Sequence, residues 1–87
     1  MVLAGDTVFG LATEGTTAYL AADEAGLRVI DVTDPDDPVE IGYLDTPGQA
    51  YDVAVVGSTA YVADGEGGLR IVDLALPGRP LELGSYD

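Results

Sequence analysis

The amino-acid sequence repeats itself once, at an offset of 42 residues that holds without a gap along the 87-residue chain. Of the 45 aligned pairs, sixteen are identical. In the second copy the identical residues are Ala54, Gly57, Thr59, Ala60, Tyr61, Ala63, Glu66, Gly68, Leu69, Arg70, Asp73, Pro77, Pro80, Glu82, Gly84 and Asp87. A repeat of this length corresponds to one supersecondary unit, so the sequence predicts two equivalent units, residues 1–42 and 43–87.

Each copy contains four short apolar runs, which in the second copy span residues 51–56, 60–63, 69–74 and 81–86. The first two runs are separated by Gly57-Ser58, which favours a two-residue hairpin turn of type II′. A glycine-rich loop follows the second run, and a Pro-x-x-Pro loop at residues 77–80 follows the third. At the corresponding place in the first copy, Asp34-Pro35-Asp36-Asp37 suits a type I turn. Because Gly or Pro interrupts every helical window, the sequence predicts an all-β fold of two four-stranded antiparallel units.

The composition removes most catalytic chemistries. The chain has no cysteine, histidine, lysine or tryptophan, and it carries 16 acidic residues against three arginines, for a formal net charge of −13. Disulfide scaffolds, Cys/His zinc sites, Ser-His and Cys-His nucleophiles and lysine Schiff bases each lack an essential residue. So negative a chain repels phosphate backbones and anionic lipid, and we therefore expect neither nucleic acid nor a membrane as a partner.

The sequence shows no targeting or membrane-spanning pattern. No apolar run approaches the about 20 residues that cross a bilayer. The N-terminus lacks a basic region followed by an apolar stretch and a cleavage site, so we expect a soluble chain without a signal peptide. The absence of cysteine is compatible with any redox compartment, and composition therefore leaves the cellular location open.

Several segments of the repeat resemble one known family. The third apolar run reads Leu69-Arg70-Ile71-Val72-Asp73, and its partner reads Leu27-Arg28-Val29-Ile30-Asp31. Together with Ala-Tyr-Val-Ala-Asp at 60–64, the Gly-x-Gly-Gly that follows and the Pro-x-x-Pro loop, this run is similar to the LVIVD repeat. The resemblance covers nearly the whole chain and fades over residues 1–9. It implies a β-propeller, usually with many such repeats in bacterial or archaeal surface-associated proteins, hence a cell-surface or extracellular location, and it brings no established catalytic residues.

Two propeller blades leave two sheet faces without a neighbour. The runs at 53–56 and 69–72 are apolar on both sides, which is typical of a sheet covered on both faces. A bare face of four short strands measures about 300 Å², and monomers seldom leave about 600 Å² of apolar surface exposed. Since propellers close with about four to eight blades, we predict a closed ring formed by homo-oligomerisation. A homo-trimer or homo-tetramer, with six or eight blades, is favoured over a four-blade dimer.

Two other interpretations remain open at this stage. In the first, the two sheets pack as a β-sandwich within a monomer. In the second, the chain is an engineered or excised piece of a longer propeller, as suggested by its abrupt start in phase with the repeat and its stop at a repeat end.

Charged residues recur in both copies on the third and fourth runs. They are Arg28, Arg70, Asp31, Asp73, Glu40 and Glu82. Each arginine precedes an aspartate by three residues and is matched with a glutamate on the adjoining run. Because guanidinium offers a planar fork of donors, we expect ion pairs between strands or between blades. The alternative is that the arginines face a channel and hold an anionic ligand.

The loop after the second run carries two further acidic residues. Asp64 and Glu66, interleaved with glycines, resemble half of a calcium loop and predict a weak Ca²⁺ site. The alternative is a glycine-rich hairpin with solvated acids. Apart from this ion, we expect no cofactor.

Asp52 and Glu14 break the repeat, because their partners at the 42-residue offset are Gly10 and Val56. If the first strands line a central channel, these acids concentrate negative potential there, which suits cations or polyhydroxylated ligands. As a pair they would allow acid/base chemistry on a glycosidic bond, which needs two carboxyl groups about 5 to 10 Å apart.

Two pairs of aromatic residues also recur. Tyr19 and Tyr61 occupy the same place in the second run, and we expect both to pack in the core with bonded hydroxyl groups. Phe9 and Tyr51 form a similar conservative pair.

Together these features predict a non-catalytic, self-assembling β-propeller module whose partner is a further copy of itself. Because every added copy multiplies the negative charge, we expect salt to tighten the assembly. The alternative function is a carboxylate-based glycan hydrolase or lyase acting in the channel.

Overall fold

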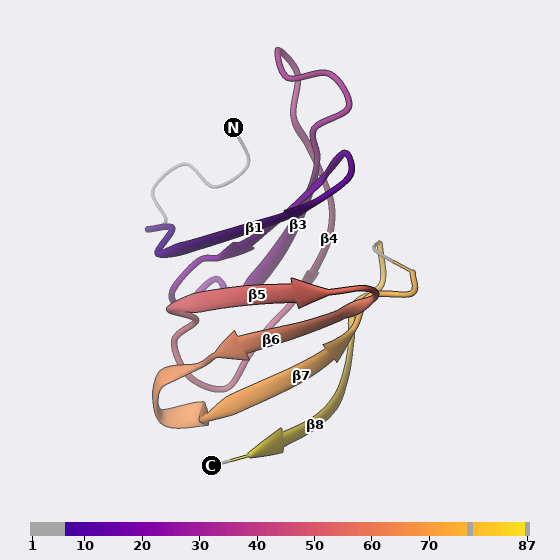
Figure 1. Cartoon of the computed structure of the whole chain (residues 1–87). Helices are drawn as coiled ribbons and strands as arrows, with labels where there is room; N and C mark the ends of the chain where they lie inside the picture. Colours follow the sequence, from indigo (N-terminus) through magenta and orange to yellow (C-terminus); the bar gives the residue numbers. More distant parts are fainter. Residues whose placement is uncertain (1–6, 77, 87) are drawn as a thin grey trace.

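The protein folds into two four-stranded antiparallel sheets, one for each copy of the repeat (Figure 1). The structure is a computed structural model and describes residues 7–76 and 78–86. The first sheet contains β1 (Gly10–Glu14), β2 (Thr17–Ala21), β3 (Leu27–Asp31) and β4 (Val39–Leu44). The second contains β5 (Asp52–Val56), β6 (Thr59–Ala63), β7 (Leu69–Asp73) and β8 (Leu81–Tyr86), with a 3₁₀ turn, η1 (Gly65–Gly67), between β6 and β7. Strand order follows chain order in both sheets, which confirms the predicted all-β class.

Two-residue turns close the first hairpin of each sheet. Strand pairing leaves Gly15-Thr16 and Gly57-Ser58 as these turns. Gly15 and Gly57 each have a φ of 59°, the left-handed conformation that a type II′ turn requires at its first position. Glycine adopts this conformation without a steric penalty, so the two copies form the same hairpin at the same place in the repeat.

The loop between β3 and β4 begins with the predicted turn. The N–H of Asp37 donates to the carbonyl of Asp34 over 2.9 Å, and the N–H of Asp36 donates to Asp34 Oδ1 over 3.0 Å. In the second sheet the N–H of Arg79 donates to the carbonyl of Leu76 over 2.8 Å. Pro77, the first proline of that second loop, lies outside the described residues. The backbone bond is thus kept although the acids of the first loop are replaced in the second.

The main core lies between the two sheets. Tyr19, Leu27 and Val29 on one face of the first sheet pack with Val53 and Val62 of the second. The first strands of the two sheets, β1 and β5, are in contact and run side by side (Figure 1). The two sheets form an open pair, so the closed ring predicted from the sequence is not present within one chain.

The segment that joins the sheets is tied back to the first of them. β4 extends to Leu44, so the first sheet passes the boundary that the 42-residue offset sets after residue 42. Asp23 and Ala50 then form an isolated bridge, with N–H···O distances of 3.0 Å in both directions. Within residues 7–76 and 78–86 no helix is long and apolar enough to cross a membrane.

Gly26, the residue before β3, offers a test of this arrangement. Its φ is 75°, and a Cβ added there would collide with the carbonyl oxygen of Leu44. We expect Gly26→Ala to lower the free energy of unfolding by about 2–3 kcal/mol, because it combines left-handed strain with a backbone clash. Gly84→Ala is the matched control, since a Cβ there meets nothing within 4 Å and its φ is not positive. Chemical denaturation compares the two variants, and equal small losses would contradict the packing of β3 against β4.

Candidate interaction surface

The junction between the sheets buries one face of the first sheet. Strand register places Tyr19, Leu27 and Val29 on this face, where their side chains are 3, 0 and 0% exposed. They belong to one apolar cluster with Val62 and other residues of the second sheet. Burial raises the pKa of the Tyr19 phenol, and the negative charge of Glu14 raises it further. The second sheet therefore covers this face and excludes water from it.

The corresponding face of the second sheet is uncovered, and we call it the open face. Its residues are Asp52, Ala54, Val56, Thr59, Tyr61, Ala63, Leu69, Ile71, Asp73, Leu81, Gly84 and Tyr86. Tyr61, the counterpart of Tyr19, is 39% exposed, and Leu69, the counterpart of Leu27, is 36% exposed. Of the two tyrosines expected in the core, Tyr19 is buried and Tyr61 is not, because only the first sheet has a neighbour on that side.

The other face of the first sheet corresponds to the buried face of the second, and we call it the leading face. Its described residues are Leu11, Thr13, Ala18, Leu20, Arg28, Ile30, Glu40 and Tyr43. Ala18, Leu20 and Ile30 are buried in a second apolar cluster, whereas Leu11 and Tyr43 are 61 and 54% exposed. The open face and the leading face thus repeat the side-chain types of the internal junction, although Ala18, Leu20 and Ile30 of the leading face are already buried within one chain.

The repeated arginines lie next to the repeated glutamates. Arg28 Nη1 is 3.3 Å from Glu40 Oε2, and Arg70 Nη1 is 3.3 Å from Glu82 Oε2. The Arg28 guanidinium also lies over the ring of Tyr43, 4.7 Å from its centroid. Both ion pairs join the third and fourth strands of a single sheet, so they hold strands together within a sheet.

Asp31 and Asp73 take no part in these ion pairs within the described part of the chain. Residues three apart on a strand point to opposite faces, so Asp31 lies on the other side of the sheet from Arg28. The hydroxyl and the N–H of Thr33 donate to Asp31 Oδ1 over 2.6 and 2.9 Å and lower the pKa of that carboxyl. Asp73 Oδ1 accepts the N–H of Ala75 over 2.9 Å. Both aspartates therefore cap the loop that follows their strand.

Asp64 is the one charged side chain among the described residues that is fully buried. Its Oδ2 accepts the N–H of Gly48 over 2.8 Å and lies 3.8 Å from Arg70 Nε. Its Oδ1 is buried without a hydrogen-bond partner among the described residues. Asp64 therefore fastens the segment between the sheets to the β6–β7 loop, and its counterpart in the first copy is Ala22, which has no such group.

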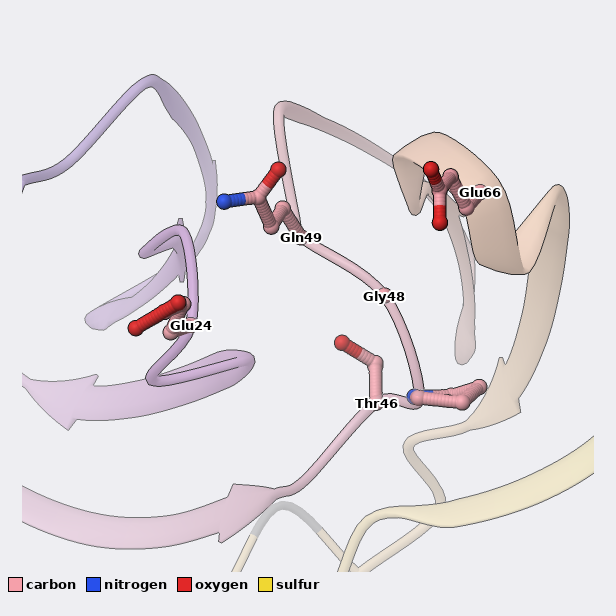
Figure 2. A pocket seen from close by; sticks show the side chains of 6 residues that line it. Glu24, Thr46, Gly48, Gln49 and Glu66 are labelled. Carbon is pink, nitrogen blue, oxygen red and sulfur yellow. The ribbon is translucent and has the colours of Figure 1, made fainter.

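Glu66, the other acid of that loop, lies in η1 and faces a cleft of about 400 Å³. Figure 2 shows Glu24 and Glu66 on opposite sides of this cleft, with Thr46 and Gln49 on the segment between them. Gln49 Oε1 is occupied by a hydrogen bond from the hydroxyl of Tyr51, at 2.9 Å. Asp64 does not line the cleft, and no group of three or more acids suited to a metal occurs in the described residues.

Asp52 and Glu14 lie at opposite ends of the first strands. Asp52 begins β5, Glu14 ends β1, and Gly10 at the start of β1 lies against Asp52. Four residues of a strand span about 13 Å, so the two carboxylates of one chain stand farther apart than the pair in a glycosidase. Asp52 Oδ1 accepts the N–H of Val53 over 2.9 Å.

The structure also brings together residues that the sequence treats only as equivalents. The rings of Phe9 and Tyr51 lie 5.2 Å apart, tilted by 55°, at the start of β1 and β5. Their pairing at the 42-residue offset shows that they occupy the same place in each copy, and the contact follows once the copies lie side by side. The close approach of β5 to Gly10 is harder to predict from the sequence. The sequence shows only that glycine at residue 10 is replaced by aspartate at the same position of the second copy.

Comparison with known proteins identifies the repeat. A family model described as LVIVD repeat matches the chain twice, over residues 7–46 and 47–87, and confirms the resemblance seen in the sequence. Such repeats indicate a β-propeller-type repeat domain. No curated protein and no solved structure matches the chain.

The buried carboxylate offers a test of the segment between the sheets. We expect Asp64→Ala to lower the free energy of unfolding by about 2–4 kcal/mol, because Gly48 loses its acceptor and Arg70 loses a buried counter-charge. Glu66→Ala, an exposed change in the same loop, should alter it by less than about 0.5 kcal/mol. Urea denaturation of the two variants measures the difference, and similar effects of both changes would contradict the role given to Asp64.

Proposed function

Because the chain belongs to the LVIVD-repeat family, we propose that it is a non-catalytic structural and interaction module that completes a β-propeller by binding copies of itself. In the proposed ring, the open face of one chain packs on the leading face of the next. The observation that supports this proposal is the contrast between Tyr19, 3% exposed, and its counterpart Tyr61, 39% exposed.

The internal junction serves as the template for this contact. The open face repeats the residue types that already pack in the first sheet, with tyrosine and leucine at the same positions. The leading face likewise repeats the types on which they pack. Burial of such a face removes apolar area from water, which favours association by about 25 cal/mol for each Å². A second copy of the chain therefore offers a leading face that matches the open face, because the two faces repeat the two sides of the internal junction.

The contact joins two different surfaces, so it is heterologous and adds chains head to tail. Heterologous contacts produce a closed ring only when the rotation between neighbours closes, and they otherwise produce a filament. Propellers close with about four to eight blades, and three or four two-blade chains give six or eight. We therefore propose a homo-trimer or homo-tetramer.

Mass in solution tests the proposed assembly. The 8.9 kDa chain should sediment at three or four times its own mass, and Tyr61→Glu should weaken the assembly at least about a hundredfold by burying an unpaired charge. Leu76→Glu is the control, since Leu76 is 65% exposed in the β7–β8 loop and lies on no strand of the open face. A wild-type chain that stays folded and monomeric at every concentration and salt level would refute self-association.

Salt dependence gives a second test. Each chain carries a net charge of −13, so chains repel one another, and salt screens that repulsion. We expect the dissociation constant, measured by sedimentation, to fall at least about tenfold between 20 mM and 500 mM NaCl, in contrast to association through ion pairs. A rise in the dissociation constant with salt would indicate a contact made by charged groups instead of apolar faces.

A further inference from the structure

We propose that the junction between two chains is wider than the junction within a chain where the first strands, β5 of one chain and β1 of the next, face each other. The reason is that Asp52 occupies in this contact the position that Gly10 occupies in the internal junction. This inference rests on the proposed self-association and concerns the same surfaces. It makes Asp52 the residue that sets the spacing between copies.

The internal junction is closest at the start of β1. A Cβ built on Gly10 would lie 2.8 Å from both the Cα and Oδ1 of Asp52, and 3.2 Å from the carbonyl oxygen of Tyr51. Real Cβ atoms do not approach a backbone carbon so closely, and a backbone atom cannot move aside as the tip of a side chain can. β1 and β5 therefore come together only because residue 10 has no side chain.

The same contact between two chains would place Asp52 in the role of Gly10. Register puts Asp52 in line with Ala63 and Leu69, on the side of the second sheet that forms the open face. Its Cβ would then meet the Cα of Gly10 in the next copy, at the distance that the internal junction excludes. The hydrogen bond from the N–H of Val53, at 2.9 Å, holds Asp52 Oδ1 close to Gly10 of the same chain, so the Cβ of Asp52 is the group that meets the next copy. In the proposed contact, β5 of one chain and β1 of the next must therefore lie farther apart than β1 and β5 do within one chain.

The aromatic residues beside this contact, Phe9 and Tyr51, tolerate such a shift. Phe9 and Tyr51 remain 51 and 44% exposed after they pack on each other inside the chain, so Tyr51 has a side free for Phe9 of the next copy. Aromatic pairs are favourable over ring separations of about 4.5 to 7 Å, which leaves room beyond the 5.2 Å of the internal pair. Tight junctions within chains and wider junctions between chains then alternate around the ring, and the assembly comes apart at the wider ones.

Substitutions at Asp52 separate this steric role from the effect of its charge. The dissociation constant of the full chain and of Asp52→Gly, Asp52→Ala and Asp52→Asn is measured by sedimentation in one buffer. We expect Asp52→Gly to lower the dissociation constant at least about tenfold, because only glycine lets β5 of one chain and β1 of the next come as close as they do within one chain. Asp52→Ala and Asp52→Asn should stay within about threefold of the wild type, since each keeps the Cβ.

The outcomes distinguish the two proposals. Equal tightening in all three variants would assign the effect to the carboxylate charge and overturn the steric role, and so would an assembled wild type that Asp52→Gly does not tighten. A wild type and an Asp52→Gly variant that are both monomeric would overturn self-association itself. Thermal unfolding at dissociating dilution shows whether loss of the bond to Val53 weakens the variant's fold. As an independent check on the tight contact, Gly10→Ala should lower that midpoint by about 4–8 °C or more.

Discussion

The structure depends on the removal of apolar sheet faces from water. Each sheet of this protein is apolar on both sides, yet a chain with two sheets contains a single junction between them. That junction supplies most of the core, and it uses the same side-chain types that lie exposed one repeat later. An uncovered face of this kind is unfavourable in water, and a repeat protein resolves it by adding further repeats or by capping. Here tyrosine, leucine and valine remain exposed on the open face beside Asp52, Thr59 and Asp73.

Charge acts against this apolar attraction without directing it. The two Arg–Glu pairs each lie within one sheet, so they stabilise a blade and leave the partner to be chosen by shape and apolar contact. The net charge of −13 opposes every association between like chains. For the proposed assembly, the balance between these two effects predicts that association depends on the ionic strength of the solution.

The repeat in the sequence was enough to predict the strands, the hairpin turns and the family, because these depend on local spacing and on residues that recur. The contacts across the repeat were harder to predict. Asp64 accepts a hydrogen bond from the N–H of Gly48, which is 16 residues away in the chain. Tyr19 and Tyr61 occupy the same position of the repeat, but a second sheet covers Tyr19 and no described part of the chain covers the face that carries Tyr61. Asp31 forms no ion pair with Arg28 among the described residues, because residues three apart on one strand point to opposite faces of the sheet.

The asymmetry between the two tyrosines also provides the most direct measurement. Hydroxyl-radical footprinting reads the solvent exposure of each tyrosine in the intact chain over a range of protein concentrations. Self-association through the open face predicts that Tyr61, 39% exposed in one chain, becomes as protected as Tyr19 when the concentration rises, while Leu76 in the β7–β8 loop stays reactive. A Tyr61 that remains equally reactive at every concentration would contradict the proposal that further copies of the chain cover this face.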